Sequence, residues 1–176
     1  MIQHRIHTGY LIAVVLVLAF SRLVPHPPNV VPIAAMALFA GAFFSNRFLA
    51  FVVPLAAMVL SDYVIGFHST VWYVYAGILL TVLIGSVVNK VTVVRVGVAA
   101  VMATFAFFLI TNFGAWLHHD MYSQDLNGLL QAYVAGIPFL RNSLIANLIF
   151  SYLVFYGLYS LITGFIPDKY LLKRSH

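Results

Sequence analysis

The sequence predicts an all-α membrane protein, a bundle of six transmembrane helices in one integral membrane domain spanning residues 1–176. Three observations support this prediction. Hydrophobic residues make up 63% of the chain and charged residues 7%, whereas a soluble domain carries about 25% charged residues. The apolar residues fall into long runs, and a membrane-spanning helix needs about 20 of them. The basic residues gather on one side of the layout that these runs imply.

Six apolar runs are the predicted spans, at 8–24, 30–46, 48–66, 70–89, 95–117 and 142–164. The first has a basic start but no small-residue cleavage site, so it is interpreted as a span and not as a signal peptide. The second is short, with Asn29 as its expected N-cap and Pro32 in its first turn. Between the fifth and sixth runs, Leu126 to Val134 is predicted to form a short extra helix at the membrane surface.

The basic residues predict the orientation. With the N-terminus inside, the cytoplasmic side receives seven of the nine lysines and arginines: Arg5, Arg47, Lys90, Arg95, Lys169, Lys173 and Arg174. Only Arg22 and Arg141 fall outside. Such a bias is typical of multi-pass membrane proteins, so we expect a multi-pass protein with both termini in the cytoplasm. It also accounts for the net charge of +5 without a nucleic-acid partner.

Two charged residues lie inside predicted spans at similar depth. Arg22 comes about 14 residues into its helix, or about 21 Å along it. An arginine at mid-helix costs about 2.5–3.5 kcal/mol on insertion scales, so it needs a partner or a function. Asp62 is the only acidic residue within a predicted span. Two interpretations stay open: Arg22 pairs structurally with Asp62, or its guanidinium binds an anionic part of a ligand.

The segment PHPPN, from Pro25 to Asn29, predicts a break in the helix because proline lacks the backbone N–H and restricts the preceding residue. Irregular backbone at membrane depth is tolerated only where protein covers it or a cavity meets it. Most other unusual polar residues map to the same outer side. The predicted solute-binding residues are therefore Arg22, His26, Asn29, Asp62, His68, Asn112, Trp116, Tyr122, Arg141 and Asn142.

Other patterns are weaker. Ser143, Asn147 and Ser151 form a stripe that predicts hydrogen bonds between helices. The chain has no cysteine, and a metal site would have to use the histidines His26, His68, His118 and His119. Adjacent histidines on a helix diverge by about 100°, and no H-x-x-x-H spacing is present, so no metal site is assigned. No phosphate loop, nucleophile elbow or H-E-x-x-H motif occurs, so neither an enzyme nor a cofactor is expected.

Several segments resemble a known family. They are RLVPHPPNVVPIAAMALFAGAFF, PLAAMVLSDYVIGFH, FLITNFGAWL and GLLQAYVAGIPFLRN. Together they are similar to the characteristic segments of a bacterial family of small transport-type membrane proteins. That family in turn resembles the S components of energy-coupling-factor transporters, on the basis of size, six spans and an early helix rich in small residues.

This resemblance implies a six-helix subunit that binds a vitamin or similar solute at the outer face of the bilayer. It also implies a transmembrane coupling subunit with ATPases as partner, for which Ala34, Ala37 and Gly41 are the expected contacts. The leading hypothesis is thus a solute-binding transport subunit for a small nutrient. The alternatives are a structural or assembly subunit of a membrane complex and, third, a divalent-metal carrier.

Overall fold

A computed structural model describes residues 8–118 and 120–158 of the chain. Within these residues the chain is helical and has no strand, which confirms the predicted all-α class. The elements are, in order, α1 (Thr8–Phe20), the 3-10 turn η1 (Ser21–Leu23), α2 (Ile33–Phe43), α3 (Arg47–Ile65), α4 (Val71–Ser86), α5 (Val93–His118), α6 (Leu126–Tyr152) and the π-helical turn η2 (Leu153–Leu158). The predicted end of the sixth run, at 164, and the basic residues near both termini lie outside the described residues.

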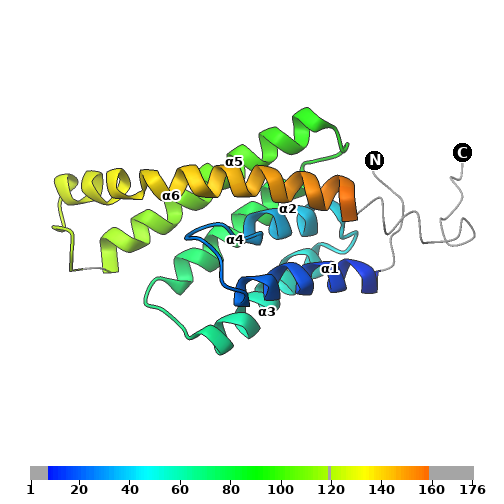
Figure 1. The fold of residues 1–176 in the computed structure, drawn as a ribbon, viewed down its shortest axis with the longest axis horizontal. Coiled ribbons are helices and arrows are strands. Elements are labelled where there is room, and N and C mark those ends of the chain that lie inside the picture. Colours follow the sequence, from blue (N-terminus) through cyan, green and yellow to red (C-terminus); the bar gives the residue numbers. More distant parts are fainter. Residues whose placement is uncertain (1–7, 119, 159–176) are drawn as a thin grey trace, which may run out of the picture.

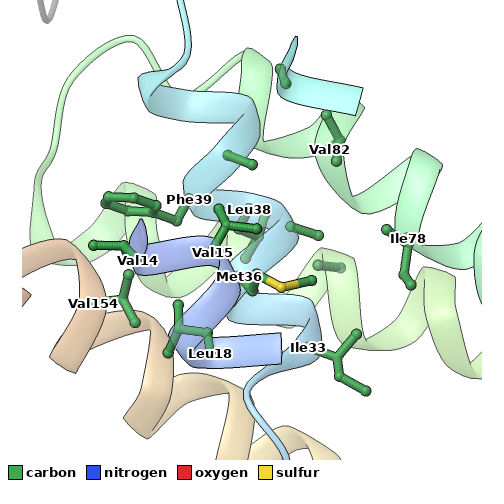
Figure 2. Close-up of a cluster of buried hydrophobic side chains, with 14 of the residues drawn as sticks. Val14, Val15, Leu18, Ile33, Met36, Leu38, Phe39, Ile78, Val82 and Val154 are labelled. Atoms are coloured by element: carbon green, nitrogen blue, oxygen red, sulfur yellow. The ribbon is translucent and has the colours of Figure 1, made fainter. Parts of the chain in front are cut away.

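Helix α2 lies at the centre and packs against each of the other five α-helices. Its sequence explains this place, because six of its eleven residues are alanine or glycine and let neighbouring helices come close. Every residue from Ala35 to Gly41 is buried. Figure 2 shows its larger side chains, among them Met36 and Phe39, enclosed by side chains of α1, α4 and η2.

The burial of α2 corrects the expected partner contact. Ala37 is fully buried and Gly41 is buried inside the bundle, so neither presents a surface to another subunit. Ala34 is half-buried and borders a cavity. The small residues of α2 therefore permit packing within this chain, a use that sequence alone does not separate from packing against a partner.

Three helical segments are long and apolar enough to span a membrane: Arg47–Ile65, Val93–His118 and Leu126–Gly157. The remaining apolar helices are shorter, and α2, with 11 residues, extends for only about 16 Å. These three segments indicate a membrane protein. That all six runs cross the membrane remains a prediction.

The outer surface of α5 supports a lipid environment. Large apolar side chains recur there every three or four residues and are exposed: Val94, Val98, Met102, Phe105, Leu109 and Phe113. This spacing places them on one face of the helix. A water-soluble protein rarely exposes so continuous an apolar stripe, so lipid is the natural cover for this face.

Helix α6 differs from the prediction. In place of a short helix ending near Val134 and a separate span from 142, one helix runs from Leu126 to Tyr152 through Pro138. A proline removes one backbone donor and crowds the preceding turn. Unwinding the helix would expose several more backbone groups in an apolar environment, so the helix continues.

The start of α6 is set by Asp125, whose side chain accepts a hydrogen bond from the N–H of Gly128 at 2.8 Å. The Ser123 hydroxyl donates to the same carboxylate at 2.8 Å. The Gly128 N–H, followed by the Ser123 hydroxyl, holds the pKa of Asp125 below its ordinary value of 3.8. An ionised N-cap of this kind satisfies the free amides at the start of a helix.

The helices alternate in direction, which places their connections at two ends of the molecule. In Figure 1, α1 begins and α6 ends at the right, whereas the connection between α5 and α6 lies at the left. Arg47 is the first residue of α3, and Lys90 and Arg95 lie near the start of α5. Helices α1 and α3 end on the opposite side of the bundle from these starts.

Candidate functional site

A cavity of about 940 Å³ lies between η1, the segment 24–32 and the facing sides of α5 and α6. The C-terminal end of α3, His68 and one residue of α4 complete its wall. Of the 22 described residues that line it, thirteen are apolar, and Arg22 is the only arginine, lysine or acidic residue. Small-molecule sites typically occupy about 300–1,000 Å³ and combine apolar walls with a few placed polar groups. The cavity has the size and composition of a ligand site.

Arg22 reaches from η1 to α3. Its Nη1 donates to Asp62 Oδ1 at 2.6 Å and to Ser61 Oγ at 3.2 Å, and it contacts the sulfur of Met58 at 3.5 Å. The predicted pair with Asp62 is therefore confirmed. Among the described residues, Nε and Nη2 of Arg22 make no hydrogen bond. The pair thus holds the guanidinium at the cavity wall and leaves donors of Arg22 available to a ligand.

Asp62 lies behind Arg22 and does not itself line the cavity. Its side chain is 1% exposed, and both carboxylate oxygens have partners. Oδ1 accepts from Arg22, and Oδ2 accepts from the Tyr75 hydroxyl at 2.9 Å. A buried carboxylate needs this degree of satisfaction. Asp62 was predicted to bind solute, but the structure places it as the residue that positions Arg22.

The proline-rich segment forms the side of the cavity next to Arg22. The N–H of Val30 donates to the carbonyl of Pro27 at 3.1 Å, which closes a β-turn. Pro28 occupies the second position of this turn, and Asn29 the third with a φ of 61°, a combination typical of a type II turn. The predicted N-cap role of Asn29 is wrong, because α2 begins after Pro32 and has no side-chain cap. Asn29 instead lines the cavity.

Helix α5 contributes a polar and aromatic wall. Thr104, Phe107, Phe108, Thr111 and Asn112 line the cavity and recur at helical spacing on one face. The Thr111 hydroxyl donates to the carbonyl of Phe107 at 2.9 Å, and the Asn112 side-chain N–H donates to the carbonyl of Phe108 at 2.9 Å. These bonds satisfy the side chains within their own helix.

Helix α6 faces this wall with Phe139, Leu140, Ser143 and Asn147. Asn147 is buried, and its Nδ2 donates to the Ala100 carbonyl and to Thr104 Oγ1, both at 2.9 Å. Ser151 donates to Asn147 Oδ1 at 3.3 Å. The predicted hydrogen bonding between helices is thus confirmed for Asn147.

The structure brings half of the predicted site residues together around the cavity. Those that line it are Arg22, His26, Asn29, His68 and Asn112. Asn142 lies next to it, since its Nδ2 reaches the Pro28 carbonyl at 3.4 Å. Trp116 and Tyr122 lie instead at the α5–α6 connection, where the indole N–H donates to the Ser123 carbonyl at 2.9 Å. Arg141 is exposed and outside the lining set.

The histidines do not form a metal site in the part of the chain that is described. No group of three histidine, aspartate or glutamate residues there is placed to hold a metal ion. His26 contacts the Pro27 carbonyl at 3.0 Å, and His118 contacts the Tyr73 hydroxyl at 3.2 Å. His119, the fourth predicted candidate, lies outside the described residues.

A comparison with protein-family models matches residues 3–168. The chain belongs to DUF6580, a family of unknown function. No curated protein and no solved structure matches the chain. Membership in DUF6580 therefore supports a shared fold but assigns no activity, and the argument for function rests on the cavity.

Some cavity residues of this DUF6580 member were missed in the sequence. Phe108 and Thr104 lie about one and two turns before Asn112 on the same face of α5, so the helical phase of Asn112 points to them. Thr111 directly precedes Asn112 and was missed as well. Ser143 and Asn147 were recognised as a polar stripe but were not assigned to the site. Tyr75 has no such signal, because its approach to Asp62 depends on how α3 packs against α4.

We expect two variants of Asn29 to show whether the turn requires this residue for its positive φ or for its side-chain amide. Asn29→Val places a β-branched residue at positive φ and should lower the free energy of unfolding by about 1–2 kcal/mol. Asn29→Gly accepts this φ and should change stability by less than about 1 kcal/mol. Thermal unfolding of the purified variants measures both. Equal loss in the two variants would show that the amide, and not the φ value, is what the turn requires.

Proposed function

We propose that this chain is the solute-binding subunit of a membrane transporter that takes up a small, vitamin-like nutrient from the outer face of the bacterial inner membrane. The observation that carries this proposal is the cavity of about 940 Å³ with Arg22 in its wall. Burying one arginine in an apolar region is costly, and such residues by default mark ligand or ion pathways. Here the arginine lines a space that is large enough for a ligand.

The distribution of charge supports the orientation in this proposal. Arg22, His26 and His68 line the cavity at one end of the bundle. The starts of α3 and α5, which carry Arg47 and Arg95, lie at the opposite end. Basic residues accumulate on the cytoplasmic side, and this supports an orientation with the cavity toward the outside and both termini in the cytoplasm. This is the side from which a nutrient arrives.

Energy for uptake would come from a partner. The sequence shows no phosphate-binding loop. A transmembrane coupling subunit with ATPases, as in transporters with S components, would supply the missing step. The contact surface for such a partner is not the buried part of α2.

The proposal can be tested with a variant whose larger side chain fills the cavity. Ser143 lines it from α6 and is half-buried, so Ser143→Phe should lower ligand affinity at least about tenfold by occupying the space. The matched control is Ile149→Phe on the same helix, where the side chain is 52% exposed on the outside, and it should leave affinity unchanged. Small molecules that co-purify with the wild type are identified by mass spectrometry and then titrated against both variants.

A null result in two assays would end this proposal. If nothing co-purifies and a panel of vitamins, nucleosides, amino acids and organic acids produces no thermal shift, the cavity is not a solute site. The other candidate, an assembly subunit, is favoured by the Arg22–Asp62 pair, since both carboxylate oxygens bind protein groups. The double variant Arg22→Gln/Asp62→Asn should then leave the function of the complex intact.

A further inference from the structure

The hydrogen-bonding groups of the cavity are not evenly mixed. Arg22 lies on the side formed by α1 and α3, and helix α1 packs on α2 and α3. Thr104 and Asn147 lie on the side formed by α5 and α6, which pack on each other. The two sets of polar groups are thus carried by different helix pairs, with the apolar N-terminal end of α2 bordering the space.

The Arg22 side offers hydrogen-bond donors. A guanidinium has five N–H groups and no acceptor. Its contacts with Asp62, Ser61 and Met58 all use Nη1. Within the described chain the other N–H groups are unpaired, and no acidic residue lines the cavity. A carboxylate can accept two such donors, and these charge-assisted bonds are about twice as strong as neutral ones.

The α5–α6 side offers mainly acceptors. The Thr104 hydroxyl donates to the Ala100 carbonyl at 2.8 Å, and the Thr111 hydroxyl donates to the Phe107 carbonyl. A carbonyl can only accept, so both hydroxyl protons are committed and only lone pairs remain. Both protons of Asn147 Nδ2 are likewise used, by Ala100 and Thr104. A ligand group that binds these three side chains has to bring its own N–H or O–H, whereas Asn112 and Ser143 on the same side can still donate.

The space between the two sides is lined by apolar and aromatic side chains. Phe107 and Phe108 border it from α5, and Phe139 and Leu140 border it from α6. Aromatic side chains in such positions favour a planar or aliphatic ligand body, which gains by stacking and by leaving water. A cation is disfavoured, because the described lining of the cavity holds one arginine and no carboxylate.

We propose that the ligand is an organic acid whose carboxylate binds Arg22, whose flat apolar body lies between the phenylalanines, and whose N–H or O–H group donates to the side of the cavity that carries Thr104, Thr111 and Asn147. This proposal rests on the proposed function, because it names the chemical class of the solute. It also orients the ligand, with the carboxylate toward the proline-rich segment and the donor toward α5 and α6.

The test uses matched probes with the protein purified in detergent. Indoleacetate, para-hydroxyphenylacetate and pterin carboxylate each carry one carboxylate, a flat ring and a remote donor. Their primary amides lack the charge, and tryptamine and tyramine carry the opposite charge. Binding measured by thermal shift should be at least about tenfold weaker for the amides than for the acids, because the amides lose the charge-assisted hydrogen bonds to Arg22. The amines should not bind.

Variants test which residues bind the carboxylate and which bind the donor group of the ligand. In Arg22→Gln/Asp62→Asn both charges are removed while hydrogen-bonding groups stay, so this variant should fold and should bind acid and amide equally. Thr111→Val keeps the shape of the side chain and removes a lone-pair acceptor. It should reduce the advantage of indoleacetate over its N-methyl analogue, which lacks the ring donor, and should leave the preference for acid over amide unchanged.

The outcomes separate this inference from the proposed function. Acid-selective shifts, or a co-purified organic acid with a remote donor, support the ligand class. Amines or amides that bind as well as the acids, or a co-purified ligand without an acidic group, would overturn the class while the solute-binding function stands. A complete lack of ligand, in the probes, the co-purified fraction and the broad panel, would overturn both.

Discussion

Replacing Asp62 with alanine is expected to lower the free energy of unfolding by about 3–5 kcal/mol, because it leaves one member of a buried ion pair without its partner. Arg22 would lose the carboxylate that it contacts at 2.6 Å, and its side chain is only 15% exposed. The Tyr75 hydroxyl would lose its acceptor as well. Removing one partner is therefore expected to lower stability much more than removing both charges together.

The control is the neutral double variant Arg22→Gln/Asp62→Asn. It removes both charges together and keeps amide groups that can bond to each other and to Tyr75, so it should recover most of the lost stability. For a protein of this size, about 1 kcal/mol corresponds to about 2–4 °C in Tm, so Asp62→Ala should unfold roughly 6–20 °C below the wild type. An alanine variant as stable as the wild type, or a double variant as unstable as the single, would contradict the ion-pair account.

The Arg22–Asp62 pair shows what sequence can predict in a membrane protein. The reason is physical: a charge in hydrocarbon must find a partner, and the predicted spans held one acidic residue at the depth of Arg22. For the same reason, the stripe of Ser143, Asn147 and Ser151 predicted hydrogen bonds between helices. In both cases a polar side chain in an apolar environment must find a polar partner. Residue type and depth in the membrane were therefore enough to predict the interaction.

Other features depend on tertiary packing and could not be predicted in this way. Tyr75 satisfies Asp62 only because α4 packs against α3 at that level. The predicted break between Val134 and residue 142 does not occur, because unwinding α6 at Pro138 would expose backbone groups in an apolar environment. The turn that places Asn29 in the cavity was interpreted as a helix cap, since the same residue type serves both uses.

The cavity itself was only half predicted. Polar residues of the outer half were grouped by their expected side of the membrane, which correctly put Arg22 and Asn112 in the same space. This grouping also included Trp116, which shares the helical face of Asn112 but lies one turn further on, at the α5–α6 connection. Position along the helix, and not helical phase, separates Trp116 from the residues of α5 that line the cavity.

The contact between α2 and α4 supplies the second large expected effect. A side chain at Gly41 would overlap the carbonyl of Val82, and one at Gly85 would overlap the carbonyl of Leu38. The two glycines thus let the backbones of α2 and α4 meet at the centre of the bundle. Backbone cannot rotate away as a side chain can, so Gly41→Ala should lower the free energy of unfolding by about 3 kcal/mol or more, the upper end for overpacked cores.

The matched control for this prediction is Gly9→Ala in α1, where an added methyl group meets no atom within 4 Å. This variant should be neutral or should gain about 0.5–1 kcal/mol, because alanine favours the helix more than glycine does. Thermal unfolding and gel filtration of the two variants in detergent compare them directly. Since α2 also borders the cavity through Ala34, Gly41→Ala should reduce ligand binding together with stability. A Gly41→Ala protein with wild-type Tm would mean that α2 and α4 do not meet at these glycines.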